Sequence, residues 1–254
     1  MSTTYDLTDP QERADGIARA TETLGARGLV VMPTDTVYGV AADAFSPQAV
    51  ATLLAAKGRG RHMPPPVLIP RPETLHGLAT DVPEGAVALA EKFWPGALTL
   101  ILMAQPTLTW DLGETRGTVA LRMPDHPDAL ELLSQTGPLA VSSANRSGMP
   151  AAMSAHQAQD MLGDSVAVYL EGVARSESEQ ATSETEPREP APPSTIVDYT
   201  VTPPRVVRAG AISVEKLREA DQTILDIEGN PAPATNPAPQ TQQDTQEPGE
   251  TLEQ

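Results

Sequence analysis

A short apolar run that leads straight into a polar loop is the feature that most limits how this chain can fold. Residues 29–32, Leu-Val-Val-Met, are typical of a buried strand. Residues 33–39, Pro-Thr-Asp-Thr-Val-Tyr-Gly, follow at once, so the strand ends in small hydroxyl and acidic side chains. Small ligands usually bind at such strand ends in α/β sheets. The segment fits either a ligand-binding loop or a plain boundary between a strand and a turn.

Helix and strand patterns alternate along most of the chain. A helix-start pattern at Asp9 and Pro10 and a later Gly28 bound a first helix, and Ser46 and Gly58 bound a second. The expected helices cover 10–27, 47–57, 85–93 and 127–136. The expected strands cover 29–32, 67–69, 98–103, 119–123, 139–141, 166–170, 195–199 and 205–208. This alternation predicts an α/β fold with a mixed β-sheet and flanking helices.

Two polar segments are predicted to lie outside the folded core. Residues 174–193, rich in Glu, Ser, Thr and Pro, predict a flexible acidic insert between two strands. Residues 221–254 predict a disordered tail rich in Pro, Gln and Glu, with the strongest bias in 229–254. The remainder predicts one catalytic domain over residues 1–220.

Most of the net charge of −17 lies in and beside these polar segments, since residues 171–193 carry −4 and residues 214–254 carry −7. The acidity therefore says little about the charge of a binding surface. The chain has no cysteine, which excludes disulfides, thiolate nucleophiles and Cys-ligated zinc. Its N-terminus is polar, and its longest apolar run, 100–104, is too short to cross a bilayer. These two features predict a cytoplasmic protein without a membrane segment.

Cations and hydroxyl groups follow several of the expected strands and helices. The loop 142–148, Ser-Ser-Ala-Asn-Arg-Ser-Gly, fits hydrogen bonding to phosphate or ribose oxygens, or the capping of a turn. Lys57, Arg59 and Arg61 follow a helix with glycines between them, and a helix C-terminus explains one cation more easily than three. Together with the strand-end arginines at 122 and 208, they predict a pocket for a polyphosphate and a carboxylate.

Several familiar catalytic motifs are missing. The chain has neither a GxxxxGK[ST] loop nor a GxGxxG motif, and its four histidines show no metal-ligand spacing. No nucleophilic triad can be assembled from the sequence. An enzyme with this inventory would act by positioning its reactants and neutralising charge.

Seven segments, taken in order, resemble the YrdC-like family of threonylcarbamoyl-adenylate synthases. They are 33–39, 57–59 with Pro64, 93–99, 119–124, 142–148, 194–198 and 207–210. The resemblance spans about residues 10–215 and implies a twisted mixed sheet with a concave, basic cavity, in the single-domain form. Two departures stand out: Glu171-Gly172-Val173 opens a longer insert than in many relatives, and Pro65-Pro66 stiffens the turn before a strand.

This resemblance implies a nucleotidyltransferase that condenses L-threonine, bicarbonate and ATP to L-threonylcarbamoyladenylate and pyrophosphate. Mg²⁺ would enter with ATP as part of the substrate. The product would pass to a tRNA threonylcarbamoyl transferase complex that modifies adenosine 37, and tRNA itself is a candidate partner. An alternative is a YrdC-like RNA-binding protein without adenylate-forming activity. A carbamoyl-transfer module of the hydrogenase-maturation type is disfavoured, because those modules occur in longer chains with zinc-finger cysteines.

The resemblance also implies a role for each matching residue. The threonine and bicarbonate ligands would be Thr34, with Thr36 as a further candidate, Arg122 and Ser194. The ATP ligands would be Lys57, Arg59, Thr118, Ser143, Asn145 and Arg208. Lys57 and Arg59 would be the catalytic residues because they hold the phosphates, with Arg61 as a helper.

Overall fold

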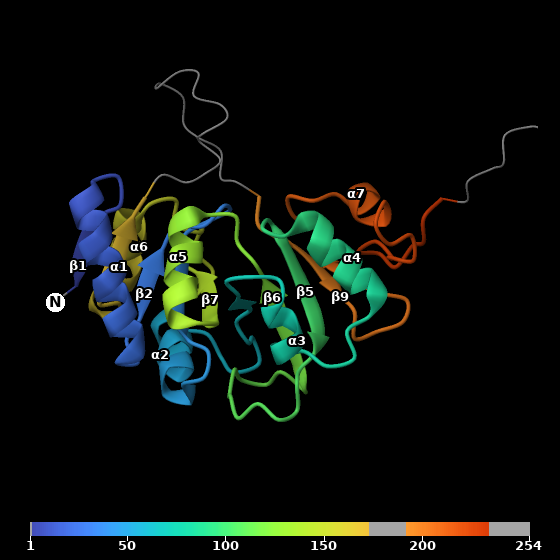
Figure 1. The fold of residues 1–254 in the computed structure, drawn as a ribbon, viewed down its shortest axis with the longest axis horizontal. Helices are drawn as coiled ribbons and strands as arrows, with labels where there is room; N and C mark the ends of the chain where they lie inside the picture. The colour runs from blue at the N-terminus through green and yellow to red at the C-terminus, as the bar shows by residue number, and fades with distance from the viewer. Residues whose placement is uncertain (1, 173–191, 234–254) are drawn as a thin grey trace, which may run out of the picture.

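Ten strands form a single mixed sheet in the computed structural model, which describes residues 2–172 and 192–233 (Figure 1). The strands are β1 (Thr3–Asp6), β2 (Val30–Met32), β3 (Gly39–Asp43), β4 (Val67–Leu68), β5 (Leu98–Met103), β6 (Thr118–Arg122), β7 (Leu139–Ser143), β8 (Val168–Glu171), β9 (Thr195–Asp198) and β10 (Arg205–Arg208). Their order across the sheet is β1-β8-β2-β3-β7-β4-β6-β5-β9-β10.

Parallel and antiparallel pairs are mixed within this sheet. β8 runs parallel to β1 and β2, β4 to β6, and β5 to β9. The remaining neighbours are antiparallel. β4 has only two residues, so a short pairing joins the two halves of the sheet. The α/β class with a mixed sheet that the sequence predicts is confirmed.

Helices flank the sheet, and side-chain caps fix the start of several of them. The helices of the described residues are α1 (Pro10–Gly25), α2 (Pro47–Lys57), α3 (Thr74–Leu78), α4 (Glu84–Phe93), α5 (Pro127–Thr136), α6 (Ala155–Leu162) and α7 (Val214–Arg218), with a 3₁₀ turn at Gly163–Ser165. The Asp9 carboxylate accepts two backbone N–H groups of the first turn of α1, and Ser46 accepts one in α2. Gly58, with φ +62°, ends α2 in the left-handed conformation that glycine adopts readily.

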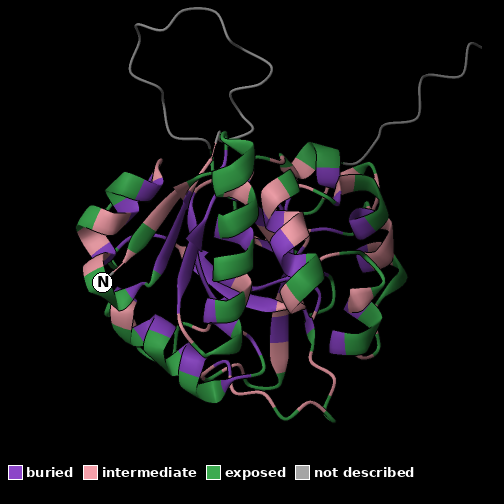
Figure 2. Ribbon diagram, turned by 60° about the vertical axis from the view of Figure 1, so that its left-hand side comes forward, coloured by how far each residue is buried: buried purple, intermediate pink, exposed green. Residues whose placement is uncertain are grey.

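The sheet buries side chains on both of its faces. On one face, Ile17 of α1 and Leu132 of α5 belong to a core with Val30 and Leu139. On the other face, α2, α4 and α6 pack against alternate strand residues such as Val31. This alternation follows from the pleat, in which successive side chains point to opposite faces. Figure 2 shows the result, with buried strands inside and exposed outer surfaces on the helices.

The sequence predicts the long elements well and misses several short ones. The expected helices at 47–57 and 127–136 have the bounds of α2 and α5, and all eight expected strands are present with end shifts of no more than two residues. β1, β3, α3, α6 and α7 are additional. They are short, and β1 and α6 carry few large apolar residues.

The predicted domain boundary at residue 220 lies too early. Ile224 is fully buried in the core, and Leu225 exchanges backbone hydrogen bonds with Pro204 and Val206 at 2.9 Å. Arg218 then donates to the carbonyl oxygen of Asn230 at 2.7 Å. Burial of Ile224 therefore extends the folded chain past residue 220, and the bond from Arg218 extends the ordered contacts to Asn230. Residues 234–254 of the predicted tail, and the predicted insert apart from residues 192–193, lie outside the described residues.

Within the two described stretches, none of the helices is both long enough and apolar enough to cross a lipid bilayer.

Candidate functional site: an arginine-lined cavity on the open face of the sheet

One face of the sheet changes from covered to open across β4. Strand register places Leu139 of β7 beside Leu68 of β4, and Leu68 beside Arg122 of β6. Leu139 and Leu68 belong to the core packed by α1 and α5. Further along the same face, Arg122 of β6, Thr99 of β5 and Ile196 of β9 line cavities. The face that helices cover in one half of the sheet is therefore hollow in the other half.

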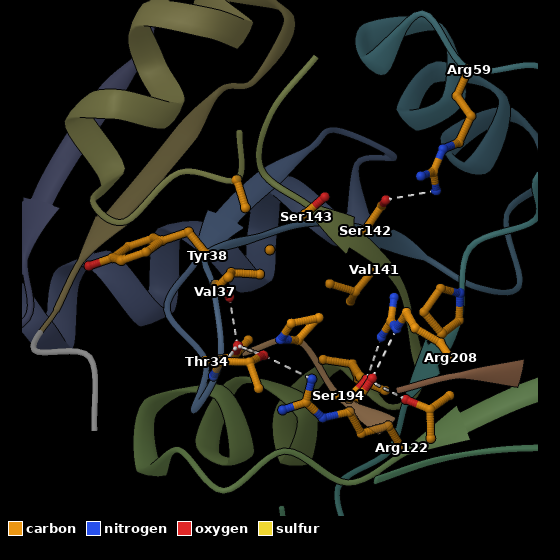
Figure 3. A pocket seen from close by; sticks show the side chains of 17 residues that line it. Thr34, Val37, Tyr38, Arg59, Arg122, Val141, Ser142, Ser143, Ser194 and Arg208 are labelled. Carbon is orange, nitrogen blue, oxygen red and sulfur yellow. Dashed lines mark hydrogen bonds between the residues drawn. The ribbon is translucent and has the colours of Figure 1, made fainter. Parts of the chain in front are cut away.

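The main cavity on this face has a volume of about 340 Å³. Figure 3 shows side chains from several separate chain segments converging on it. Of the eleven candidate site residues predicted from the sequence, seven line it: Thr34, Thr36, Arg59, Arg122, Ser143, Ser194 and Arg208. Among the residues that the structure describes, the lining includes three arginines and no carboxylate. The cavity is therefore lined by fixed positive charge and hydroxyl groups.

The loop before β3 presents its hydroxyl groups in a fixed arrangement. The Thr34 hydroxyl donates to the carbonyl oxygen of Val37 at 2.6 Å and lies 3.2 Å from the Thr36 hydroxyl. The backbone N–H of Thr36 donates back to the Thr34 hydroxyl at 3.2 Å. Both threonines are about 5% exposed or less. These bonds make the 33–39 segment a structured wall of the cavity, which favours the ligand-loop interpretation of the sequence.

Arg122 joins three parts of the chain at the base of the cavity. Its Nε donates to the carbonyl oxygen of Gly96 at 3.0 Å, and its Nη1 donates to the Thr36 hydroxyl at 3.0 Å. Its Nη2 donates to the Asp35 carboxylate at 2.6 Å. Burial lowers the pKa of Arg122, and the charge of Asp35 opposes that effect. Arg122 remains a cation with a fixed orientation.

Ser194, the residue before β9, and Arg208, the last residue of β10, form a second hydrogen-bonded group. Arg208 donates from Nε to the carbonyl oxygen of Ser194 at 2.9 Å and from Nη2 to its hydroxyl at 2.7 Å. The Ser194 hydroxyl also lies 2.8 Å from the Thr99 hydroxyl. Figure 3 shows these contacts and labels Arg122 on the same cavity.

Arg59 reaches the cavity from the loop after α2. Its Nη1 donates to the Ser142 hydroxyl at 3.1 Å. Its Nε is buried and has no hydrogen-bond partner among the described residues. Because buried donors in proteins are nearly always paired, an unpaired guanidinium nitrogen here indicates a position where an anionic ligand supplies the acceptor.

The three arginines raise the electrostatic potential of the cavity together. Burial lowers the pKa of Arg208, and the charges of Arg122 and Arg59 lower it further. Burial also lowers the pKa of Arg59. Cations that repel one another in a partly buried site gain stability when an anion binds between them. This arrangement is suited to a polyanion.

Lys57 and Asn145 support the cavity without lining it. The Lys57 ammonium donates to the carbonyl oxygens of Ser143 and Asn145, the latter at 2.6 Å, and is 1% exposed. The Asn145 amide donates to the carbonyl oxygens of Arg146 and Met149. These two residues therefore hold the 142–149 loop in shape, and direct contact with a substrate by either one stays a prediction.

Thr118 lines a second cavity of about 240 Å³ that lies against the first. Arg59, Pro66, Thr99 and Arg208 line both cavities. The two hollows therefore share a wall that carries two of the three arginines. A ligand with an anionic centre and a larger neutral end could occupy both at once.

The helper role predicted for Arg61 is not supported by its position. Its Nη2 donates to the Asp111 carboxylate at 2.8 Å, the side chain is 55% exposed, and it lines neither cavity. The backbone carbonyl of Arg61 also accepts the N–H of Glu114 at 2.8 Å. Arg61 instead joins the loop after α2 to the loop before β6.

Sequence reasoning missed Asp35 and Ser142 as parts of the site. Asp35 was visible only as one letter of the 33–39 segment, and its contact with Arg122 spans 87 positions in the sequence. Ser142 was recognised as part of a hydroxyl loop, but its contact with Arg59 spans 83 positions. No local sequence signal identifies either pair, because the sheet order brings them together.

An α/β sheet with an open face that carries three arginines and several hydroxyl groups defines a class: proteins that bind an anionic small molecule through fixed charge and hydrogen bonds. Comparison with known proteins gives the particular family. The chain belongs to the Sua5/YciO/YrdC family, whose model, described as "Telomere recombination", matches residues 22–210. The family resemblance predicted from the sequence motifs is confirmed.

Two curated relatives show how much of the chain is shared. A Mycobacterium tuberculosis protein provisionally named a threonylcarbamoyl-AMP synthase is 51% identical over 219 residues, which cover 86% of this chain and 95% of that protein. The threonylcarbamoyl-AMP synthase of Pyrococcus abyssi is 37% identical over 206 residues, which cover 80% of this chain and 56% of the relative. The chain thus spans nearly all of the mycobacterial relative and little more than half of the archaeal one.

Solved structures agree with this family. Pyrococcus abyssi Sua5 complexed with L-threonine matches with a TM-score of 0.75 and 31% identity, over 89% of this chain and 62% of that one. Escherichia coli YciO matches with a TM-score of 0.70 over 85% of this chain and all of its own. Its identity of 24% shows the shared fold alone.

Proposed function

We propose that this protein condenses L-threonine, bicarbonate and ATP to L-threonylcarbamoyladenylate and pyrophosphate, which makes it a nucleotidyltransferase. The observation that carries the proposal is the cavity of about 340 Å³ whose lining includes Arg59, Arg122 and Arg208 together with threonine and serine hydroxyls. Relatives named threonylcarbamoyl-AMP synthase, and a related structure that holds L-threonine, support this function over the RNA-binding alternative.

The amino acid would occupy the part of the cavity between the 33–39 loop and β9. Thr34 and Ser194 supply hydroxyl groups there, and Arg122 supplies a guanidinium for the threonine carboxylate or bicarbonate. The triphosphate would lie beside Arg59 and Arg208 and against Ser143. The adenosine would extend into the second cavity, toward Thr118.

The chemistry requires orientation and charge neutralisation more than a covalent protein intermediate. The amine of threonine attacks bicarbonate, and loss of water gives a carbamate. A carbamate oxygen then attacks the α-phosphorus of ATP, the bond between the α-phosphorus and the bridging oxygen breaks, and pyrophosphate leaves. The arginines would neutralise the charge that develops on the departing pyrophosphate. Holding the reactants in contact also protects the labile carbamate from water.

Mg²⁺ belongs to this proposal only as the counterion of the ATP substrate. Among the described residues, no three His, Cys, Asp or Glu side chains come together in a way that could hold a metal ion. The Asp35 carboxylate, which contacts the lining residue Arg122, is already in an ion pair. No step is therefore assigned to a protein-held metal.

Lys57 acts on the loop rather than on the phosphates in this proposal. Its ammonium group and the amide of Asn145 fix the backbone of residues 143–149, from which Ser143 faces the cavity. The catalytic role predicted for Arg59 is retained, and that of Lys57 becomes support of the ATP-binding loop.

Because the adenylate product is reactive, this proposal implies a second enzyme that uses it. We place a tRNA threonylcarbamoyl transferase complex downstream, which would transfer the threonylcarbamoyl group to adenosine 37 of tRNA. Direct tRNA binding and a cytoplasmic location stay predictions.

The test is a pyrophosphate assay of the full chain with ATP, Mg²⁺, bicarbonate and L-threonine. Release that requires both threonine and bicarbonate supports the proposal, and detection of the adenylate by mass spectrometry identifies the product. Release that needs neither co-substrate, or no release at all, overturns it. L-Serine serves as the matched control substrate, since it lacks only the methyl group.

A further inference from the structure

A buried ion pair lies directly behind the cavity. The Asp35 carboxylate accepts a hydrogen bond from Arg122 Nη2 at 2.6 Å, and the two side chains are 12% and 9% exposed. Arg122 lines the cavity, whereas Asp35 does not. Asp35 therefore acts on a ligand through Arg122, through the loop that it shares with Thr34 and Thr36, or through its charge, and not as part of the cavity lining.

The contacts of Arg122 fix its guanidinium plane. Gly96 accepts from Nε, Thr36 from Nη1 and Asp35 from Nη2. A guanidinium has five N–H groups. Three of them are used, so two, one on each terminal nitrogen, have no acceptor within the described residues. Both remaining N–H groups lie in the guanidinium plane, where they can donate to the oxygens of a planar O–C–O anion.

We propose that Asp35 is a positioning residue that orients Arg122, so that its two remaining N–H groups bind a planar O–C–O anion in the cavity. This inference rests on the proposed function, which supplies two such anions: the carboxylate of L-threonine and bicarbonate. Asp35 fixes the direction of the two remaining N–H groups, because its carboxylate at Nη2 and the Thr36 hydroxyl at Nη1 together hold the guanidinium plane of Arg122.

The charge of Asp35 predicts an effect that a general loss of structure would not produce. The cavity lining carries Arg59, Arg122 and Arg208, and Asp35 is the carboxylate ion-paired with this group. Removing its charge makes the site more positive, which does not weaken the binding of the ATP phosphates. The loss should fall on the anion held by Arg122 alone.

The chain offers a matched control for the experiment. Asp128 pairs with Arg13 at 2.7 Å, and its side chain is 13% exposed, close to the value for Asp35. This second pair lies at the start of α5, and neither of its residues lines the main cavity. Asp128→Asn therefore removes a carboxylate of similar burial that also pairs with an arginine, although Arg13 is 35% exposed and pairs with Glu131 as well.

The test compares Asp35→Asn, Asp35→Glu and Asp128→Asn with the wild type, using steady-state pyrophosphate release and calorimetric binding of L-threonine and ATP. We expect Asp35→Asn to raise the KM for threonine or for bicarbonate by about 10- to 100-fold. The KM for ATP should stay within about twofold. The substrate whose KM rises, threonine or bicarbonate, identifies which anion Arg122 holds. Asp35→Glu should recover part of the loss, and Asp128→Asn should match the wild type in all three KM values.

Each outcome decides between the two proposals. Unchanged KM values for threonine and bicarbonate in Asp35→Asn overturn the positioning role, while wild-type turnover leaves the proposed function standing. An equal loss for all three substrates, with no recovery in Asp35→Glu, also overturns it. If the wild type binds threonine without releasing pyrophosphate, a selective loss of threonine binding in Asp35→Asn supports the positioning role although the proposed function fails. If Asp35→Asn does not fold, the KM pattern of Asp35→Glu decides, since an unchanged pattern there overturns the inference.

Discussion

The ammonium group of Lys57 lies 2.6 Å from the carbonyl oxygen of Asn145 and 3.3 Å from the oxygen of its side-chain amide. The backbone N–H of Ser147 donates in return to the carbonyl oxygen of Lys57 at 2.9 Å. The last residue of α2 and the loop after β7 are therefore joined by side chain and backbone together. With Lys57 1% exposed, loss of its side chain would leave buried carbonyl oxygens without a donor.

Lys57→Met is expected to change how stability depends on pH. Burial lowers the pKa of Lys57 to about 8, and the charge of Arg59 contributes to the shift. An unfolded lysine titrates near pKa ~10.4, so between these values the unfolded chain binds more protons than the folded one. The free energy of unfolding therefore rises with pH in this range. Relative to Lys57→Met, the wild type should gain about 1–2 kcal/mol between roughly pH 7.5 and 9.5, as measured by urea denaturation.

Turnover should move in the opposite direction over the same pH range. The charged ammonium holds the loop carbonyls more strongly than a neutral amine does. The wild-type rate should therefore fall with a midpoint near pH 8, whereas Lys57→Met should be slow at every pH. A stability difference that does not vary with pH would contradict the buried, shifted ammonium.

Arg59→Ala is expected to reduce kcat by about 10²- to 10³-fold, because it removes a cation beside the departing pyrophosphate. Within the described chain its side chain donates a hydrogen bond to Ser142 alone, so the fold should survive, with a Tm within a few degrees of the wild type. Arg19→Ala is the control, since that side chain is 56% exposed on α1 and pairs with Glu22. Wild-type turnover in Arg59→Ala would remove Arg59 from the phosphate site.

Local chemistry explains how much of the fold could be predicted. The caps at Asp9 and Ser46 and the left-handed Gly58 act within one helical turn, so their sequence patterns are sufficient to predict α1 and α2. β3 was missed because Gly-Val-Ala-Ala-Asp consists mostly of small residues with weak strand propensity. It forms because β2 and β7 pair with it on both sides.

The site residues also divide into those that the local sequence could predict and those that it could not. Residue types at strand ends were enough to identify Arg122, Ser143 and Arg208 as cavity residues. The sequence could not show that Lys57 turns toward the loop carbonyls while Arg59, two positions later, turns toward the cavity. That difference depends on Gly58, which redirects the chain, and on a loop 86 positions away.

Gly210→Ala is expected to disturb Ser194 through the backbone. A Cβ at residue 210 would lie 2.2 Å from the carbonyl oxygen of Pro193 and 2.5 Å from the nitrogen of Thr195. Since neither backbone atom can rotate away, the substitution should displace Ser194 from Arg208 and destabilise the protein by about 1–3 kcal/mol. The measurements are thermal unfolding and the KM for threonine.

Gly77→Ala is the matched control for that change. Gly77 is exposed in α3, and a Cβ there would meet nothing within 4 Å. The substitution should be neutral or stabilising by up to about 1 kcal/mol, because alanine favours a helix over glycine. Equal behaviour of the two variants would show that the contact between residue 210 and the Ser194 segment is not needed.

Ile224→Ala tests whether the segment beyond residue 220 belongs to the fold. Ile224 is fully buried, so truncation should cost about 2–5 kcal/mol through lost burial and the cavity left behind. Ile227, three residues later, is 49% exposed, and Ile227→Ala should change the free energy of unfolding by no more than about 0.5 kcal/mol. Because the two substitutions remove the same atoms, the difference between them in urea denaturation isolates burial. If both variants unfold like the wild type, the segment that carries Ile224 does not pack in solution, and the folded domain ends near residue 220.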